Sequence, residues 1–254
     1  MPSHQTGEDL ILAFDRVEFA KSLGLSPDPW QARLLRSTSS RVLLNCSRQS
    51  GKSTCSAIIA LHRALYFPNS LVLCLAPALR QSQELFAKIA SFYRDLGRPI
   101  PPQGERRLSL DLENGSRIIT LPGSEKTVRG FSGVGLLIVD EAARVDDQLY
   151  YACRPMLAVS GGSLMMLSTP ASKRGVFYTE WTSGLGWERY EVRADDCPRI
   201  TAAFLEEERK ALPPPVYRAE YECSFEALDD QPFSEAMIAS AFSDESVKPL
   251  FPGM

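Results

Sequence analysis

The fold is decided at residues 47–53, which read Ser47-Arg48-Gln49-Ser50-Gly51-Lys52-Ser53. A short apolar run at 41–46 precedes this stretch, and a segment with helical character at 54–66 follows it. A strand, a tight loop and a helix in this order bind phosphates, because loop amides and the helix N-terminus direct donors at the anion. Cys46 stands where the full phosphate-loop pattern has its first glycine, so the interpretation needs support from elsewhere in the chain.

The loop predicts how a nucleotide and its metal ion are held. Lys52 reaches the β- and γ-phosphates, and the Ser53 hydroxyl binds Mg²⁺. The nucleotide-binding residues that we expect are Gln31, Ser47, Arg48, Gln49, Ser50, Gly51, Lys52, Ser53 and Thr54. Gln31 follows Trp30 before a helix at 31–37. It either hydrogen-bonds the adenine edge or lies on the surface beside a core tryptophan, and the spacing favours neither.

The bulk composition fits a globular protein. The chain has 254 residues, of which 44% are hydrophobic and 23% charged, enough for one large α/β domain or two small ones. It has no apolar stretch that could span a bilayer and no signal-peptide pattern. Six scattered cysteines indicate reduced, buried thiols, and the isolated His4 and His62 argue against a histidine metal site. With a net charge of −3, contact with DNA would need a local basic patch or several copies of the chain.

Continuous apolar runs alternate with helical segments along the chain. The runs lie at 41–46, 71–75, 136–139 and 163–167, a further strand is expected at 190–193, and helical spacing is found at 54–66, 79–96 and 146–157. This alternation predicts a mainly parallel sheet covered by helices on both faces, with the ligand beyond the carboxyl ends of the strands. An Asn-Gly turn inside 107–121 predicts a hairpin.

The two ends of the chain have weaker patterns. An amphipathic piece at 10–23 belongs to a poorly specified lead-in, and helices are expected at 201–212 and 216–223. Between these two helices, Pro213-Pro214-Pro215 is interpreted as a stiff spacer.

Two further polar clusters fall at the carboxyl ends of predicted strands. Asp140 and Glu141 follow the run at 136–139, where a helix N-cap would be the simple explanation. Adjacent carboxylates are unfavourable there without a cation. We therefore interpret Asp140 as holding Mg²⁺ through water and Glu141 as the base that orients and deprotonates the attacking water. Ser168 and Thr169, after the next strand, form either a capped turn or a sensor that couples loss of the γ-phosphate to movement.

Arg48 and Arg129 are candidates for stabilising phosphoryl transfer. A guanidinium placed against the equatorial oxygens can raise the rate by roughly 10³ to 10⁵. Arg48 lies inside the phosphate loop, and Arg129 lies on a glycine-flanked loop before the strand at 136–139. A surface or ion-paired arginine is the alternative for each. The expected catalytic set is therefore Glu141, Lys52, Arg129 and Arg48.

Taken in order, these motifs resemble the ATPase domain of the large terminase subunit of tailed bacteriophages. The resemblance extends over roughly 27–233, most of the chain. It rests on Trp30-Gln31, on 47–53, on Ala76-Pro77 with Gln81-Ser82, on Arg129-Gly130, on 137–142, on 167–170 with 173–178 and Trp181, on 197–200 and on 220–225.

The resemblance implies a RecA-like P-loop fold of the additional-strand catalytic glutamate type, with a small C-terminal lid. It implies an ATP- and Mg²⁺-dependent motor that forms a ring of five subunits on a viral portal and pumps double-stranded DNA into a procapsid. The motor would work with the small terminase subunit in the host cytoplasm, without a membrane partner, and outside the ring the chain could be a monomer. Arg129 would act in trans on a neighbouring subunit's nucleotide, and Ser168 and Thr169 would couple hydrolysis to movement.

The chain is divided accordingly into a lead-in at 1–26, an ATPase core at 27–195, a lid at 196–233 and a tail at 234–254. Members of the family usually continue into a nuclease that uses clustered acidic residues on two Mg²⁺ ions. The acidic residues of the tail have no strand pattern to hold metals, so we expect no nuclease activity from this chain.

Two other functions compete with a packaging motor. A helicase-like, nucleic-acid-dependent ATPase would place ATP between two RecA-like domains, and this chain has room for one. A nucleotide-gated assembly module without hydrolysis is kept open by Cys46 in place of the first loop glycine, although intact Lys52, Asp140 and Glu141 argue against it.

Overall fold

The computed structural model describes residues 7–123, 128 and 130–226. Its centre is an 8-stranded sheet with the order β3-β4-β5-β2-β6-β7-β1-β8. The strands are β1 (Arg41–Cys46), β2 (Leu71–Ala76), β3 (Pro102–Arg106), β4 (Ser109–Leu112), β5 (Arg117–Pro122), β6 (Val134–Asp140), β7 (Ser163–Ser168) and β8 (Glu188–Val192). From β5 to β8 in this order every neighbouring pair is parallel, and only β3, β4 and β5 pair antiparallel. The mainly parallel sheet predicted from the apolar runs is confirmed.

The strand order places one strand between the two motifs that matter most. The phosphate loop follows β1, and Asp140 ends β6, while β7 lies between β1 and β6. This separation is the additional-strand arrangement that the resemblance implied. Because all three strands are parallel, their carboxyl ends meet at one edge of the sheet, where the polar clusters come together.

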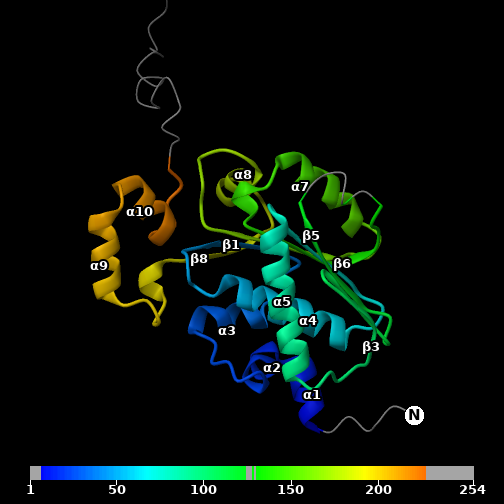
Figure 1. Ribbon diagram of the computed structural model, residues 1–254. Helices are drawn as coiled ribbons and strands as arrows, with labels where there is room; N and C mark the ends of the chain where they lie inside the picture. Colours follow the sequence, from blue (N-terminus) through cyan, green and yellow to red (C-terminus); the bar gives the residue numbers. More distant parts are fainter. Residues whose placement is uncertain (1–6, 124–127, 129, 227–254) are drawn as a thin grey trace, which may run out of the picture.

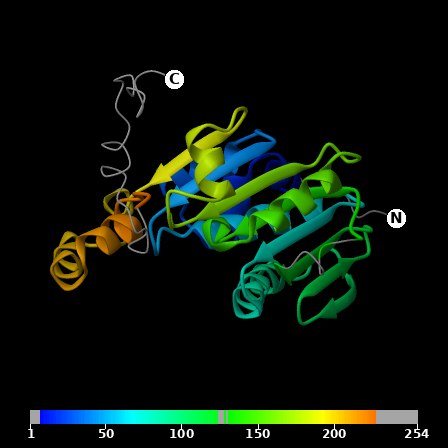
Figure 2. The ribbon, with the colours of Figure 1, turned by 90° about the horizontal axis from the view of Figure 1, so that it is seen from above.

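Helices cover both faces of the sheet, as Figures 1 and 2 show. One face carries α2 (Arg16–Ser22), α3 (Pro29–Arg36), α4 (Lys52–Tyr66) and α5 (Leu79–Asp95), and the other carries α7 (Asp147–Cys153) and α8 (Val176–Thr182). The side chains under each layer form a separate hydrophobic cluster, which contains Phe19, Leu61 and Ile89 on the first face and Leu137 and Phe177 on the second. These two clusters hold the strand ends, and hence the site, in fixed positions.

The N-terminal segment is built differently from the prediction. In place of one amphipathic piece at 10–23, the chain forms α1 (Gly7–Phe14) and then α2. Asp15 breaks the helix because its carboxylate accepts a hydrogen bond from Val17 N at 2.8 Å and so caps the start of α2. Phe19 of α2 is completely buried against the core, so this part of the lead-in is packed onto the sheet layer.

A small helical cluster lies beside β8, at the left of Figure 1. It consists of α9 (Ala202–Ala211) and α10 (Pro214–Tyr221), which pack around Ala194, Tyr217 and Tyr221. The interpretation of Pro213-Pro214-Pro215 as a spacer was wrong, because α10 begins at Pro214. Proline suits the first helical turn, where its missing N–H would have no partner within the helix.

Elements with weak patterns account for the other differences. The predicted hairpin is present as β4 and β5, but β3 adds an edge strand that the sequence did not suggest. The predicted helix at 146–157 ends earlier, since α7 gives way to a 3-10 turn at Arg154–Leu157. The short helix α8 was not predicted as an element.

Candidate functional site

The sharp turns of the phosphate loop come after Cys46, and this explains why a cysteine can replace the first glycine of the pattern. Cys46 is the last residue of β1 and pairs with Val192 of β8, so it needs only extended backbone. Left-handed backbone occurs later, at Gln49 (φ 61°) and at Gly51 (φ 93°). The position of the missing first glycine is thus a strand position in this chain, and any buried residue of suitable size fits it.

Gly51 is needed for a second reason. A Cβ built at this position would lie 2.6 Å from the Gln31 side-chain nitrogen, closer than atoms can approach. The Gln31 amide lies against the loop because its Nε2 donates to Ser50 O at 3.2 Å, while its Oε1 accepts from Asp28 N at 2.9 Å. Gln31, for which the sequence left adenine contact and a surface position open, is buried in the structure and holds the phosphate loop to the start of α3.

Arg199 holds the phosphate loop from the other side, and together Gln31 and Arg199 form what we call the brace of the loop. Its two terminal nitrogens each lie 2.8 Å from an oxygen of the buried Asp28 carboxylate, and Nη2 also donates to Ser50 O at 3.2 Å. The hydrogen-bonded carboxylate raises the pKa of the Arg199 guanidinium. Ser50 O thus receives two donors, Gln31 and Arg199, which fix the backbone of the loop in place.

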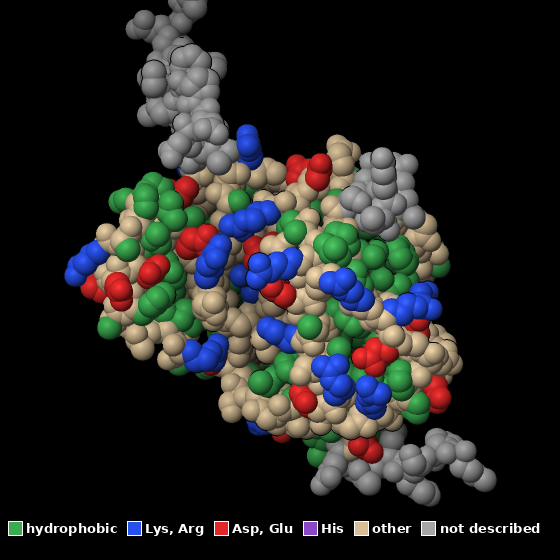
Figure 3. Space-filling view, viewed as in Figure 1, with side chains coloured by type: hydrophobic (Ala, Val, Ile, Leu, Met, Phe, Trp, Pro, Cys, Tyr) green, Lys and Arg blue, Asp and Glu red, His purple; other side chains and the backbone are tan. Residues whose placement is uncertain are grey.

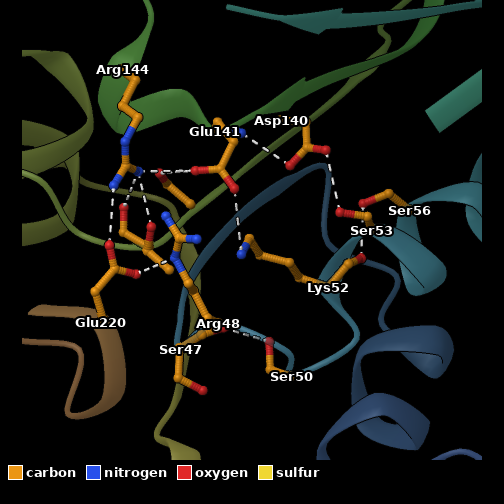
Figure 4. Close-up of polar contacts among 12 residues, drawn as sticks. Ser47, Arg48, Ser50, Lys52, Ser53, Ser56, Asp140, Glu141, Arg144 and Glu220 are labelled. Carbon is orange, nitrogen blue, oxygen red and sulfur yellow. Dashed lines mark hydrogen bonds and ion pairs between the residues drawn. The ribbon is translucent and has the colours of Figure 1, made fainter. Parts of the chain in front are cut away.

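Lys52 and Ser53 begin α4 and point at the acidic pair, as Figure 4 shows. Lys52 Nζ lies 3.5 Å from Glu141 Oε1. Ser53 Oγ donates to Asp140 Oδ2 over 3.3 Å. The structure therefore brings together the residues that the sequence assigned to phosphate and Mg²⁺.

The Asp140 carboxylate is poorly compensated. It is 6% exposed, and burial together with the neighbouring Glu141 charge raises its pKa to about 6. Oxygen ligands from a carboxylate and a hydroxyl are the donors that Mg²⁺ prefers, so Asp140 and Ser53 fit this ion. A divalent cation here would relieve the repulsion between the two adjacent carboxylates.

Arg144 is the residue that sequence reasoning missed. A 3-10 turn, Ala142–Arg144, follows Glu141 and brings the two side chains together. Arg144 Nη1 donates to Glu141 Oε2 at 2.9 Å and to Thr169 Oγ1 at 2.9 Å. Its only signal in the sequence is its position three residues after the expected base. The guanidinium links the expected base to the expected sensor.

Ser168 and Thr169 lie at the end of β7, beside the acidic pair, and both are almost completely buried. Ser168 Oγ approaches Glu141 Oε2 at 3.5 Å. Thr169 contacts the site only through Arg144 among the described residues. Ser168 therefore lies beside Glu141, and Thr169 is linked to Glu141 through Arg144.

Arg48 is turned toward the small helical cluster. Its Nε donates to Glu220 Oε2 at 2.6 Å, which raises its pKa, and its backbone N–H donates to Glu220 O at 3.0 Å. Glu220 of α10 also lies 3.8 Å from Arg144 Nη2. One carboxylate of α10 is therefore shared between the loop arginine and the arginine that contacts Glu141, and Figure 4 shows this arrangement.

These groups surround a cavity of about 510 Å³, large enough for a nucleotide-sized ligand. Its walls are Arg48, Gln49, Gly51, Lys52, Ser53, Gln81, Glu84, Leu85, Lys88, Asp140, Glu141 and Arg144. Lys88 of α5, which the sequence did not single out, donates to Thr54 Oγ1 at 3.1 Å. Figure 3 shows Lys, Arg, Asp and Glu side chains gathered between the small helical cluster and the rest of the molecule. Arg129 lies outside the described residues.

The described residues contain no group of three or more His, Cys, Asp and Glu side chains arranged to hold a metal ion. The pair formed by Asp140 and Ser53 would therefore need further ligands from a bound phosphate or from water. Within the part of the chain that the structure describes, no helix is long and apolar enough to cross a bilayer.

Comparison with known proteins gives relatives of one kind. The large terminase subunits of Thermus phage G20c and Thermus virus P23-45 are each 24% identical over 253 residues, which covers 85% of this chain. The same alignment covers 52% of each relative, so the chain spans about half the length of the curated relatives that it matches.

Solved structures agree on the fold. The large terminase ATPase domain of Thermus phage P74-26 superposes with a TM-score of 0.73 at 24% identity, covering 82% of this chain and 97% of that one. The HK97 bacteriophage large terminase gives a TM-score of 0.65 at 16% identity, covering 79% of this chain and 51% of that one. At these identities the comparison shows the RecA-like P-loop fold.

The N-terminal part of the terminase large subunit, T4-like virus type, is the family that matches, over residues 43–240. This match runs from β1 through the phosphate loop and the acidic pair to beyond α10. The chain therefore belongs to the terminase large subunit family, as its ATPase domain.

Proposed function

We propose that this domain binds ATP with Mg²⁺ and hydrolyses it at the cavity between the phosphate loop, α4, α5 and the end of β6. The observation that carries the proposal is the convergence of Lys52, Ser53 and the two carboxylates on one cavity of about 510 Å³. A large terminase from a thermophilic bacteriophage, which shares the fold at a TM-score of 0.63–0.64, was crystallised with ADP and with ATP-γ-S. That neighbour supports a nucleotide as the ligand.

The residues divide the chemical work as follows. Lys52 binds the β- and γ-phosphates, and amides of the loop surround them. Asp140 and Ser53 hold Mg²⁺, which supplies charge neutralisation on the phosphate oxygens. Glu141 accepts the proton of the attacking water, and Arg48 stabilises the transferring phosphoryl group. Gln31, Ser47, Gln49, Ser50 and Thr54 shape the loop and the start of α4 around the nucleotide.

Arg144 is assigned a positioning role in this scheme. Its hydrogen bond to Glu141 Oε2 holds the carboxylate that must accept a proton, and its second hydrogen bond ends on Thr169. Departure of the γ-phosphate would change the position of Glu141, and Arg144 would transmit the change to Ser168 and Thr169 at the end of β7. This contact gives the coupling residues a physical connection to the chemistry.

We further propose that hydrolysis drives double-stranded DNA into a viral procapsid in the host cytoplasm. The proposal is based on membership of the family and includes a ring of five subunits on the portal, assisted by the small terminase subunit. In the ring, Arg129 acts on a neighbour's nucleotide. We place the ATPase core at 27–195 and the lid at 196–233, so that Glu220 of the lid faces the core residue Arg48.

The chemical assignment is tested by release of orthophosphate from Mg²⁺-ATP. Glu141→Gln should bind ATP and lose roughly 10² to 10⁴ in turnover, the usual effect of removing a general base. Glu18→Gln is the matched control, because Glu18 forms an exposed ion pair with Lys21 on α2, away from the cavity. Normal turnover by Glu141→Gln would refute the assignment of the base, and ATP binding without any turnover by the unmodified chain would favour a non-hydrolysing assembly module.

The role of Arg129 is tested by mixing variants. Arg129→Ala alone and Lys52→Ala alone should both be inactive. If Arg129 works between subunits, mixtures should regain activity, because an intact Arg129 on the Lys52→Ala chain faces an intact loop on its neighbour. Absence of rescue at every mixing ratio would place Arg129 in cis or outside the reaction.

A further inference from the structure

A second cavity opens at the edge of the sheet opposite the phosphate loop. It has a volume of about 330 Å³ and lies among α1, α2, α4 and the first residues of β1, β6 and β7. Figure 1 shows α1 and α2 at the bottom of the view, away from α8 and α10. We name it the Arg16–Arg63 cavity, because these two arginines line it together with His62.

Arg16 reaches the cavity from the first turn of α2. Its Nη2 donates to the backbone oxygen of Ser37 at 2.5 Å, which fixes the guanidinium without neutralising it. Burial is the main cause that lowers the pKa of Arg16, and the charge of Arg63 is the second. A guanidinium loses proton affinity in this way when its surroundings hold another cation and too little negative charge.

Arg63 reaches the cavity from α4 and is likewise held by neutral groups. Its Nε donates to Ser70 Oγ at 3.1 Å, and the guanidinium carbon lies 4.3 Å from the centre of the Phe67 ring. Gly135 lets it approach the sheet, since a Cβ at that position would lie 3.3 Å from Arg63 Nη2. Burial lowers the pKa of Arg63 as well.

Among the described residues no carboxylate forms an ion pair with either arginine, and the Asp15 charge affects Arg16 less than the opposing charge of Arg63 does. The described walls of the cavity contain neither Asp nor Glu, and neither arginine forms an ion pair there. Asp15, next to Arg16 in the chain, is bound by the guanidinium of Arg36 at 2.7 Å. Glu188, behind Ser37, accepts a hydrogen bond from its hydroxyl at 2.5 Å and lines a different cavity.

Unpaired guanidiniums in a partly closed cavity are the complement of an oxyanion. Arginine offers a planar fork of donors that matches a carboxylate or a phosphate group. Apolar side chains, Leu34, Ile59 and Met165 among them, form part of the remaining wall, beside the hydroxyl side chains of Ser37, Thr38, Ser39 and Ser163. The volume lies near the lower end of the range for small-molecule sites, roughly 300–1,000 Å³. The wall therefore offers apolar contact beyond the charged group.

We propose that the Arg16–Arg63 cavity binds a small organic oxyanion, a carboxylate or phosphate group carried on an apolar body. Arg16 and Arg63 hold the charged group, and the apolar wall holds the body. His62 Nε2 donates to Leu12 O at 3.1 Å, and burial lowers the pKa of His62 to about 4, so it adds no charge to the site at neutral pH. The ligand lies on the sheet edge away from the nucleotide, and the proposal does not depend on ATP hydrolysis.

The test is calorimetric titration of the full chain with hexanoate and, separately, with phenyl phosphate. Either probe should bind, and hexanol, which lacks the charge, should bind much more weakly. Arg16→Gln and Arg63→Gln should each weaken binding about tenfold or more, the usual effect of losing a charged hydrogen bond, and the double variant should abolish it. Binding of hexanoate alone identifies a carboxylate site, and binding of phenyl phosphate alone a phosphate site.

Two controls separate this site from the nucleotide site and from misfolding. Lys52→Ala should lose ATP binding and keep binding of the probe. Arg106→Gln removes an exposed arginine whose nearest carboxylate, on Asp111, is 3.5 Å away, and it should leave probe binding unchanged. Failure of both probes to bind, equal binding of hexanol, or undiminished binding by the folded Arg16→Gln/Arg63→Gln variant would overturn the proposal.

Discussion

The arginines at the two edges of the sheet have different kinds of partner. At the phosphate edge, Arg48, Arg144 and Arg199 each contact a carboxylate, from Glu220, Glu141 and Asp28 respectively. At the other edge, Arg16 and Arg63 hydrogen-bond only neutral oxygens within the described part of the chain. The arginines of the nucleotide site are thus paired with carboxylates of the same chain, whereas the two arginines of the opposite cavity have no ion-pair partner among the described residues.

The difference shows what each edge must do to accept an anion. A triphosphate entering the first site has to compete with Glu220 for Arg48 and with Glu141 for Lys52, so binding rearranges existing pairs. An anion entering the second cavity displaces no carboxylate from its two arginines. We therefore expect binding at the phosphate edge to be coupled to movement and binding at the opposite edge to be stabilising without rearrangement.

The largest effect that we expect is a loss of folding stability at low pH, caused by His62 beside the Arg16–Arg63 cavity. Burial, and next the charge of Arg16, lower the pKa of His62 to about 4, while an unfolded histidine titrates near 6.5. The unfolded chain therefore takes up this proton first, so the stability contributed by neutral His62 is complete above about pH 6.5 and is lost as the pH falls toward 4. The loss is on the order of 3 kcal/mol, because each pKa unit corresponds to about 1.4 kcal/mol.

This acid sensitivity is measured by chemical denaturation between pH 4 and pH 7. The His62→Phe variant, compared with the unmodified chain, should show a flatter dependence of the unfolding free energy on pH. Other charged groups near His62 are Arg16 of α2 and Arg63 of α4, and both remain protonated over this range. An unchanged slope in His62→Phe would contradict the prediction.

The next largest effect comes from replacing Arg199, which holds the phosphate loop through Asp28 and Ser50. Arg199→Ala leaves the buried Asp28 carboxylate without its partner and should lower the unfolding free energy by ~1–2 kcal/mol. The value is at the low end for a broken ion pair because the Arg199 side chain is 51% exposed. Thermal or denaturant unfolding gives the measurement, and Arg106→Ala at an exposed ion pair should cost close to nothing. Equal costs for the two variants would show that the brace contributes no stability.

Substitutions at Arg144 test whether the ion pair with Glu141 contributes to catalysis. Arg144→Ala should lower kcat about tenfold and leave KM for ATP nearly unchanged, because the Glu141 carboxylate loses the group that orients it. Arg144→Lys should restore part of kcat, since it supplies charge without the two-pronged geometry. A rise in kcat would mean that Arg144 restrains Glu141, and a parallel change in KM would indicate a role in nucleotide binding.

The smallest effect belongs to the opposite edge. Arg16→Gln removes a charge that has no carboxylate partner among the described residues, so the unfolding free energy should change by less than ~0.5 kcal/mol. The measurement is denaturant unfolding in a buffer without organic anions, run beside Arg199→Ala. A loss as large as that of Arg199→Ala would show that Arg16 is a structural residue and would remove the contrast between the edges.

Much of the fold could be predicted because the parallel strands are continuous apolar runs. The prediction for β1 at 41–46 matches its bounds, and the acidic pair and Ser168-Thr169 fall at one sheet edge as expected. The edge strand β3, Pro102–Arg106, was not predicted, because it has no apolar run and is defined by its pairing with β4.

The roles of site residues could be predicted only where the residue belongs to a recognisable local sequence motif. Lys52, Ser53 and Asp140 have roles set by local backbone, and the structure brings them together. Arg144 acts through a contact with Thr169, twenty-five residues away in the chain, and such pairing leaves no local pattern. Gln31 has a motif position, but its contacts to Asp28 and Ser50 depend on how α3 packs against the loop.

Main-chain contacts between the phosphate loop and the C-terminal part of the described chain have a consequence for the order of folding. Ser47 N–H donates to Val192 O at 2.8 Å, and Arg48 N–H donates to Glu220 O at 3.0 Å. A ribosome makes the loop early and these acceptors late, so the newly made loop has donors without partners until β8 and α10 have emerged. We therefore expect nascent chains that stop at residue 195 to contain every strand of the sheet and still be unable to retain a nucleotide.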